Sequence, residues 1–369
     1  MRQLFLAMAL VGVAGLAVAA DDKKADDKKP AKIIKKGDAS KKEKPAIKLR
    51  VGDPAPPLKA TKWLQGDEVK KFERDKVYVV EFWATWCGPC IVMMPHMAEM
   101  QAEYRNKGVT FIGYSTKDPN NTEEKVVAFL KKRGPNLGYT FAYADDRNTY
   151  DAWMRAAGRG GIPCSFVVDK ASRIAYIGHP MYLDVVLPKV VSGSWDSKVS
   201  ADEVGKIEEE TSEVFKALRG DPAESLKALT AFEAKHQELN QIPYFMGPKL
   251  SALLKTGKTA EARKFAEAVV KKAGKYADAM ALRTVSATLR TEAKGNKDLM
   301  GLAVKAAEGM LAAEGDKNAM ALVNLASTHF AAGNKEKARE YGKRAVEAAE
   351  DEPARVKQSI EKQVKQFEE

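Results

Sequence analysis

Two of the three cysteines in this 369-residue chain lie three positions apart, in the segment Trp86-Cys87-Gly88-Pro89-Cys90. The preceding residues, 77–83, are β-branched and aromatic and predict a buried strand, whereas residues 91–107 have helical length. A helix N-terminus favours a thiolate, because its unpaired N–H groups and its dipole attract negative charge. The pair is therefore suited to dithiol–disulfide exchange, with Cys87 as the nucleophile and Cys90 as the thiol that resolves the mixed disulfide.

A structural zinc site and a structural disulfide are the alternatives for this pair. Zinc would need two further ligands, and the chain offers one more cysteine, Cys164, and four scattered histidines. A structural disulfide would explain two cysteines but not the Gly-Pro between them or the strand–helix context. The sequence favours redox activity, and it predicts no metal and no cofactor.

Residues 81–90, followed by Pro95, resemble the active-site segment of the thioredoxin fold. A second thioredoxin-like signature occupies 161–169, where the family places a cis-proline, here Pro163, facing the dithiol. This resemblance implies an α/β thioredoxin-like fold with a central mixed sheet flanked by helices.

A narrower resemblance is to the exported TlpA-like thiol-disulfide reductases. It rests on the opening segment Val-Gly-Asp-Pro-Ala-Pro at 51–56 and on an extra strand–helix insertion at about 109–140. The likeness covers residues 50–195, which is less than half of the chain.

Roles for the residues around the dithiol follow from their positions. Gly88 and Pro89 shape the first helical turn, where proline is tolerated because its missing N–H is not needed. A cis Pro163 would bring the backbone at Ile162 against the dithiol, where an extended substrate segment can pair. Trp86 would cover the rim, although an ordinary structural role competes with that interpretation.

Glu81 lies six residues before Cys87, on a strand that should otherwise be apolar. One interpretation is a solvated carboxylate at the end of the strand. The other is a buried carboxylic acid with a raised pKa that exchanges protons with Cys90, as the thioredoxin resemblance implies. TlpA-like proteins often carry a glutamate three residues after the second cysteine, but this chain has Met93 there. Glu81 alone is therefore predicted to carry the proton.

The third cysteine, Cys164, follows the predicted cis-proline. It is interpreted as a small buried apolar residue; the alternative is a thiol near Cys87 that modulates the potential or traps substrate. Peroxidase chemistry is disfavoured, because Ala84 occupies the position where peroxiredoxins have a threonine. His179 is interpreted as a turn residue at a strand end.

The N-terminus predicts export. Arg2, an apolar run over 4–18 and the small residues up to Ala20 are typical of a cleavable signal peptide over 1–20. A membrane anchor is the alternative, but the run is shorter than the ~20 residues that a span requires. Export places the protein in the periplasm or cell envelope.

Residues 21–48 are rich in Lys and Asp and predict a disordered linker. The chain has 61 Lys and Arg against 50 Asp and Glu, a net charge of +11. About half of this excess lies between residues 21 and 50, where twelve basic residues face six acidic ones. No basic patch is interleaved with aromatic residues, so nucleic acid is not predicted as a partner.

Two domains are predicted after the linker. Residues 49–195 alternate strand-like and helical runs, which indicates an α/β domain with a mostly parallel sheet. Residues 200–369 are rich in Ala, Lys, Glu and Leu at helical spacing.

The helical part contains an internal repeat. Gly257, Gly295 and Gly333 are 38 residues apart, and each precedes a predicted helix. This pattern resembles tetratricopeptide repeats, although the period exceeds the family's usual ~34 residues; an irregular helical bundle is the alternative. Solenoid surfaces usually bind protein partners.

Two functions remain in competition. The first is an exported thiol-disulfide oxidoreductase that reduces disulfide-bearing client proteins and exchanges electrons with a membrane electron donor or oxidant. The second is a cell-envelope scaffold whose helical repeats bind a protein partner, with a secondary or regulatory redox domain.

Overall fold

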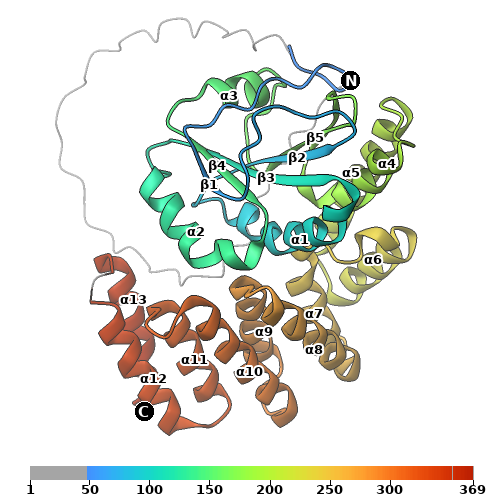
Figure 1. The fold of residues 1–369 in the computed structure, drawn as a ribbon. Coiled ribbons are helices and arrows are strands. Elements are labelled where there is room, and N and C mark those ends of the chain that lie inside the picture. The colour runs from blue at the N-terminus through green and yellow to red at the C-terminus, as the bar shows by residue number, and fades with distance from the viewer. Residues whose placement is uncertain (1–47, 351, 369) are drawn as a thin grey trace, which may run out of the picture. The chain divides into compact units, whose positions relative to one another are not determined.

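The computed structural model describes residues 48–350 and 352–368. The predicted signal peptide and nearly all of the predicted linker lie outside these residues. The described residues belong to one compact unit. It begins with an α/β part and continues as a series of helices (Figure 1).

The α/β part is built on a six-stranded sheet of order β1-β4-β3-β2-β5-β6. Its strands are β1 (Lys62–Gln65), β2 (Val77–Trp83), β3 (Val109–Thr116), β4 (Thr140–Ala144), β5 (Cys164–Val168) and β6 (Ile174–Gly178). The pairs β2–β3 and β3–β4 are parallel, and the other three pairs are antiparallel. The prediction of a mixed sheet is confirmed, and the expectation of mostly parallel pairing is wrong. A tight turn joins β5 to β6, and so short a connection permits only antiparallel pairing.

Helices cover both faces of this sheet. One face packs against α1 (Gly88–Tyr104), α2 (Glu123–Leu137) and α4 (Leu183–Ser192). The other packs against a π-helical turn at Asp151–Arg155 that follows α3 (Asn148–Tyr150). Alternate residues of β2 pack on the two faces of the sheet, because successive strand side chains point in opposite directions. All seven are buried, as expected for a central strand.

The helical part contains nine α-helices within the described residues: α5 (Val199–Ala217), α6 (Pro222–Lys235), α7 (Met246–Lys255), α8 (Thr259–Lys275), α9 (Ala279–Glu292), α10 (Lys297–Glu314), α11 (Ala319–Ala331), α12 (Lys335–Ala348) and α13 (Ala354–Val364). Each repeat glycine lies between two paired helices and has a positive φ, 76° at Gly257, 85° at Gly295 and 80° at Gly333. A left-handed glycine ends a helix without steric cost. The helices confirm the prediction of an all-α region.

The two parts share an apolar interior. The cluster under α1 and α4 continues into α5, α6 and the 3₁₀ turn η5 (Pro243–Phe245) through Val204, Ile207, Phe232, Ile242 and Phe245. The predicted boundary near residues 195–200 falls between α4 and α5. It stays a prediction, and the shared cluster indicates that the two parts do not pack independently.

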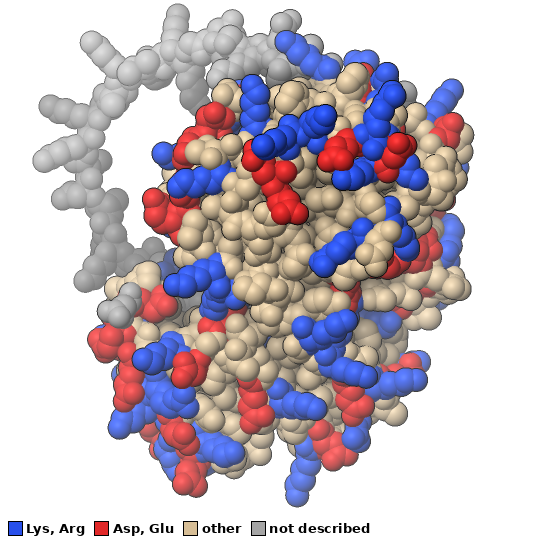
Figure 2. Space-filling view, in the orientation of Figure 1, with Lys and Arg blue, Asp and Glu red and all other residues tan. Residues whose placement is uncertain are grey.

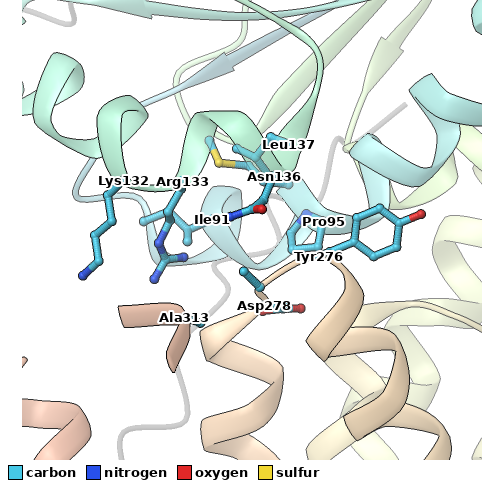
Figure 3. A pocket seen from close by; sticks show the side chains of 11 residues that line it. Ile91, Pro95, Lys132, Arg133, Asn136, Leu137, Tyr276, Asp278 and Ala313 are labelled. Carbon is cyan, nitrogen blue, oxygen red and sulfur yellow. The ribbon is translucent and has the colours of Figure 1, made fainter. Parts of the chain in front are cut away.

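Charged contacts reinforce this junction. Glu314 of α10 bonds to both Lys132 and Arg133 of α2. Lys272 of α8 lies 2.6 Å from the carboxylate of Glu99 on α1. Between α1, α2 and the turn before α9 there remains a cavity of only about 10 Å³, lined by side chains that include Ile91, Arg133 and Asp278 (Figure 3). This volume holds about one water molecule, so the junction is closely packed.

Basic and acidic side chains are interspersed over both parts on the face shown in Figure 2. Among the helices that the structure describes, none is long and apolar enough to cross a membrane.

Candidate active site

The two cysteines of the Cys-Gly-Pro-Cys turn form a disulfide with an S–S distance of 2.00 Å. Cys87 is the N-cap residue of α1, and the backbone N–H of Cys90 donates to its Sγ at 3.2 Å. Cys87 is 3% exposed and Cys90 is fully buried. When the disulfide opens, the same N–H and the helix dipole would stabilise negative charge on Cys87.

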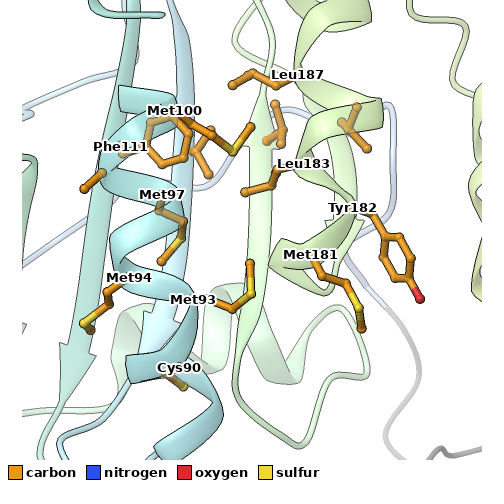
Figure 4. Close-up of a cluster of buried hydrophobic side chains, with 14 of the residues drawn as sticks. Cys90, Met93, Met94, Met97, Met100, Phe111, Met181, Tyr182, Leu183 and Leu187 are labelled. Carbon is orange, nitrogen blue, oxygen red and sulfur yellow. The ribbon is translucent and has the colours of Figure 1, made fainter. Parts of the chain in front are cut away.

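Gly88 and Pro89 form the first helical positions, so the structure places them in the turn as predicted. Next to Cys90 lies a methionine-rich apolar cluster (Figure 4). Residues of α1, of the 3₁₀ turn Pro180–Tyr182 and of α4 form this cluster, namely Cys90, Met93, Met94, Met97, Met100, Met181, Leu183 and Leu187. Met93 is completely buried in this cluster. The position that often carries a glutamate in TlpA-like proteins is therefore an apolar packing site here.

Glu81 lies on the central strand β2 and is 1% exposed. It shares the strand face of Val79 and Trp83, which pack in the same cluster as the two cysteines. Within the described residues, neither carboxyl oxygen has a hydrogen-bond partner. Burial raises the pKa of this carboxyl well above its usual value of 4.5. The structure thus excludes a solvated strand-end carboxylate and places a buried carboxyl on the central strand.

Three more buried polar atoms near this strand face lack partners in the described part of the chain: Ser165 Oγ, Trp83 Nε1 and the Tyr139 hydroxyl. Ser165 is directly opposite Glu81 in the β2–β5 register. Burial raises the pKa of Tyr139 well above its ordinary value, and the nearby Glu81 carboxyl adds to this effect. Unpaired buried polar groups cost stability, and their concentration here points to a functional requirement.

The loop before the dithiol is fixed by Asn121, a residue that the sequence did not predict to belong to the site. Its Oδ1 accepts from the backbone N–H of Thr85 at 2.8 Å and from the Thr85 hydroxyl at 2.9 Å. Its side-chain amide donates to Ser115 Oγ and to the carbonyl of Thr116, both at 2.8 Å. Asn121 is fully buried and holds a residue two positions before Cys87. Because Asn121 and Thr85 are 36 positions apart, the spacing of neighbouring residues does not predict their contact.

Trp86 forms the open rim of the site and is 55% exposed. Its indole N–H donates to the carboxylate of Asp118 at 2.9 Å. A cavity of about 120 Å³ opens beside it, lined also by Gly160, Gly161 and Ile162. The Ile162–Pro163 peptide bond is cis. Trp86 and Ile162, both predicted to bind substrate, thus line the same cavity.

Cys164 is a free, buried thiol. It is opposite Phe82 in the β2–β5 register and packs in the apolar cluster on the sheet face away from α1. Burial raises the pKa of this thiol to about 12. These features favour its interpretation as a small apolar residue over that of a modulating thiol.

The other side of the dithiol turn is closed by the helical part. Tyr244 of η5 donates its hydroxyl proton to the carbonyl of Pro89 at 2.9 Å. The same hydroxyl lies 3.5 Å from Nε2 of His179, in the loop after β6. His179 is the extended N-cap residue of the 3₁₀ turn Pro180–Tyr182, and its contact with Tyr244 could not be predicted from the sequence.

In the described part of the chain, no group of three or more His, Cys, Asp or Glu side chains is placed to hold a metal ion. The site combines a cysteine pair at a helix N-terminus, a cis-proline after Ile162, which lines the cavity beside Trp86, and a buried carboxyl on β2. Together with the mixed sheet, this arrangement defines a thioredoxin-like dithiol protein.

Comparisons with known proteins identify the family. The Redoxin family model matches residues 50–181. Protein FixW of Rhizobium leguminosarum is 34% identical over 154 residues, which cover 41% of this chain and 70% of that protein. The thiol-disulfide oxidoreductase ResA of Bacillus cereus is 32% identical over 128 residues, covering 34% of this chain and 68% of ResA. The chain therefore belongs to the TlpA-like thiol-disulfide oxidoreductases of the thioredoxin fold.

A solved thiol:disulfide interchange protein from Chlorobium tepidum TLS is similar to 40% of this chain. The match spans 99% of that structure at 26% identity, with a TM-score of 0.32. The family model ends at residue 181, before α4 begins.

Proposed function

We propose that this protein is an exported oxidoreductase that reduces disulfides in client proteins through Cys87 and Cys90. The observation that carries the proposal is the Cys87–Cys90 disulfide at the N-terminus of α1, with the Cys90 N–H directed at Cys87 Sγ. Membership of a thiol-disulfide oxidoreductase family supplies the reaction class, and the exposed Trp86 rim offers a place for a client segment.

The exchange proceeds in two displacements. The Cys87 thiolate attacks one sulfur of the client disulfide, breaks that bond and releases one client thiolate, which leaves a mixed disulfide. The Cys90 thiolate then attacks Cys87 Sγ and releases the second client thiolate. Glu81, in its ionised form, takes up the proton that Cys90 loses. Two electrons pass to the client, and a separate dithiol donor must reduce the Cys87–Cys90 disulfide again.

Export is proposed from the sequence of residues 1–20, a basic start followed by an apolar run and small residues. Cell fractionation tests it, together with N-terminal sequencing of the mature protein. A chain that begins at or next to Asp21 in the periplasmic fraction is the expected result. Recovery of the intact N-terminus from the cytosol would contradict export.

We further propose that the helical part selects the partner. The glycine-separated helix pairs resemble a repeat array, and such arrays commonly bind proteins. If partner binding is the main function, Cys87→Ser should leave it unchanged while removing reductase activity. If the partner is a client, the Cys90→Ser variant should instead capture it as a mixed disulfide.

Insulin reduction with an added dithiol donor tests the redox proposal. Cys87→Ser should abolish turnover, and Cys90→Ser should stop after a mixed disulfide forms. Cys164→Ser is the matched control, because it makes the same change at a thiol across the sheet. Full turnover in Cys87→Ser would overturn the assignment of the nucleophile.

A further inference from the structure

One peptide unit of the active-site turn is hydrogen-bonded at both ends. Its N–H, from Cys90, donates to Cys87 Sγ at 3.2 Å. Its carbonyl, from Pro89, accepts from the Tyr244 hydroxyl at 2.9 Å. A donor on an amide carbonyl polarises the N–H of the same amide, so bonds in such a chain strengthen one another. The Tyr244 hydroxyl is thereby linked to the sulfur of Cys87.

His179 orients this hydroxyl. The backbone N–H of Met181 donates to Nδ1 of His179 at 3.2 Å, which places the ring proton on Nε2. Nε2 lies 3.5 Å from the Tyr244 hydroxyl, whose own proton goes to Pro89. Burial lowers the pKa of His179 to about 4, so the ring is neutral at physiological pH. In this series of hydrogen bonds, which runs from the Met181 N–H to Cys87 Sγ, every donor thus faces an acceptor.

Tyr244 reaches the turn from the helical part and is held there by packing. Its ring meets that of His179 edge-on, with centroids 5.6 Å apart. Its neighbours Ile242 and Phe245 are buried in the same apolar cluster as both cysteines. The contact therefore depends on the docking of η5 against the start of α1.

We propose that Tyr244 is a positioning residue whose hydroxyl, oriented by His179, polarises the Pro89–Cys90 peptide and so stabilises the Cys87 thiolate. This inference rests on the proposed role of Cys87 as the nucleophile. After reduction the Cys90 N–H bond becomes charge-assisted, and stabilising the thiolate makes a dithiol protein more oxidising. The helical part thereby tunes the redox balance of the site.

The test is a pH titration of the thiolate ultraviolet absorbance in the reduced full-length protein. In Tyr244→Phe the midpoint should rise by about 0.3 to 0.6 pH units, a roughly twofold to fourfold change in the ionisation constant. The equilibrium with glutathione should move toward the protein disulfide by a similar factor. Tyr276→Phe is the matched control, because Tyr276 lies at the same junction and has no hydrogen bond to the turn among the described residues.

A second variant isolates the histidine. His179→Asn keeps an acceptor for the Met181 N–H and removes the Nε2 proton. It should shift the midpoint in the same direction by less than Tyr244→Phe, and it should add nothing in the Tyr244→Phe background.

Unchanged midpoints in both variants would overturn the inference. A titration signal that survives Cys87→Ser would instead overturn the proposed role of Cys87, so the two failures can be told apart.

Discussion

Two groups of buried polar side chains, one in the α/β part and one in the helical part, differ in how they are paired. Below the dithiol, within the described residues, the Glu81 carboxyl and the Ser165 hydroxyl have no hydrogen-bond partner. Between α9 and α11, Asn324 donates to Ser286 Oγ at 3.0 Å, and its side-chain oxygen accepts from Arg290 at 3.0 Å. The helical network holds neighbouring helices in register, whereas the unpaired groups lower stability.

His96, at the junction of the two parts, is a buried side chain that pairs with charged groups. Its Nε2 lies 2.7 Å from Asp184 of α4, and its Nδ1 lies 3.6 Å from Glu99, which also binds Lys272 of α8. Burial opposes charge on the ring, but the two carboxylates outweigh it and raise the pKa of His96 to about 9. The buried His96 cation is thus paired with carboxylates from two helices, α1 and α4.

The largest predicted effect concerns this histidine. Because the folded-state pKa exceeds the unfolded value of 6.5, the stabilisation is complete below about pH 6.5 and is lost as the pH rises through about 9. The free energy of unfolding of the oxidised protein should fall by roughly 3 kcal/mol over this window. Urea denaturation at several pH values measures it. His96→Gln should lose less stability over this window, and an equal slope in both proteins would contradict the assignment.

The second prediction concerns the unpaired carboxyl. Glu81→Gln should slow insulin reduction about 100-fold and remove one ionisation from its pH profile. Folded Glu81 keeps its proton when the unfolded residue ionises above about pH 4.5, so the wild type should lose more stability than the variant as the pH rises. Glu123→Gln, which changes a glutamate paired with Lys62 at the surface, is the matched control. An unchanged pH profile in Glu81→Gln would rule out the proton role.

The third and smallest effect tests the paired network. Asn324→Ala should lower the free energy of unfolding by about 2 kcal/mol, because it leaves Ser286 and Arg290 with fewer partners. Asn334→Ala makes the same change at the exposed N-cap of α12 and should cost about 1 kcal/mol. Equal losses in the two variants would show that the buried network adds nothing beyond a cap.

Local chemistry made much of the molecule predictable. The thiol pair, the central strand β2 and the glycine-separated helices all depend on neighbouring residues, so the sequence expresses them directly. The structure agrees with their expected positions. The short edge strand β1 was missed, because its four residues are partly exposed and lack apolar alternation.

Long-range contacts escaped prediction. Asn121 reaches Thr85 across 36 residues, and Tyr244 reaches Pro89 across 155. Asparagine before a helix and tyrosine in a turn are common for local reasons, so neither residue carried a distinguishing pattern. The direction of each strand could not be predicted either, because a run of apolar residues does not show whether the adjacent strand is parallel or antiparallel.

The apolar cluster that continues from α1 and α4 into α5 and α6 also limits how this gene can be recombined. A break at residue 195 would uncover the side chains that Val204, Ile207 and Phe232 now cover, and an exposed patch of that kind promotes aggregation. A recombination that transferred the whole segment up to Phe245 would keep the cluster intact. Lineages that shuffle domains would therefore be expected to inherit the first two helices and η5 together with the dithiol.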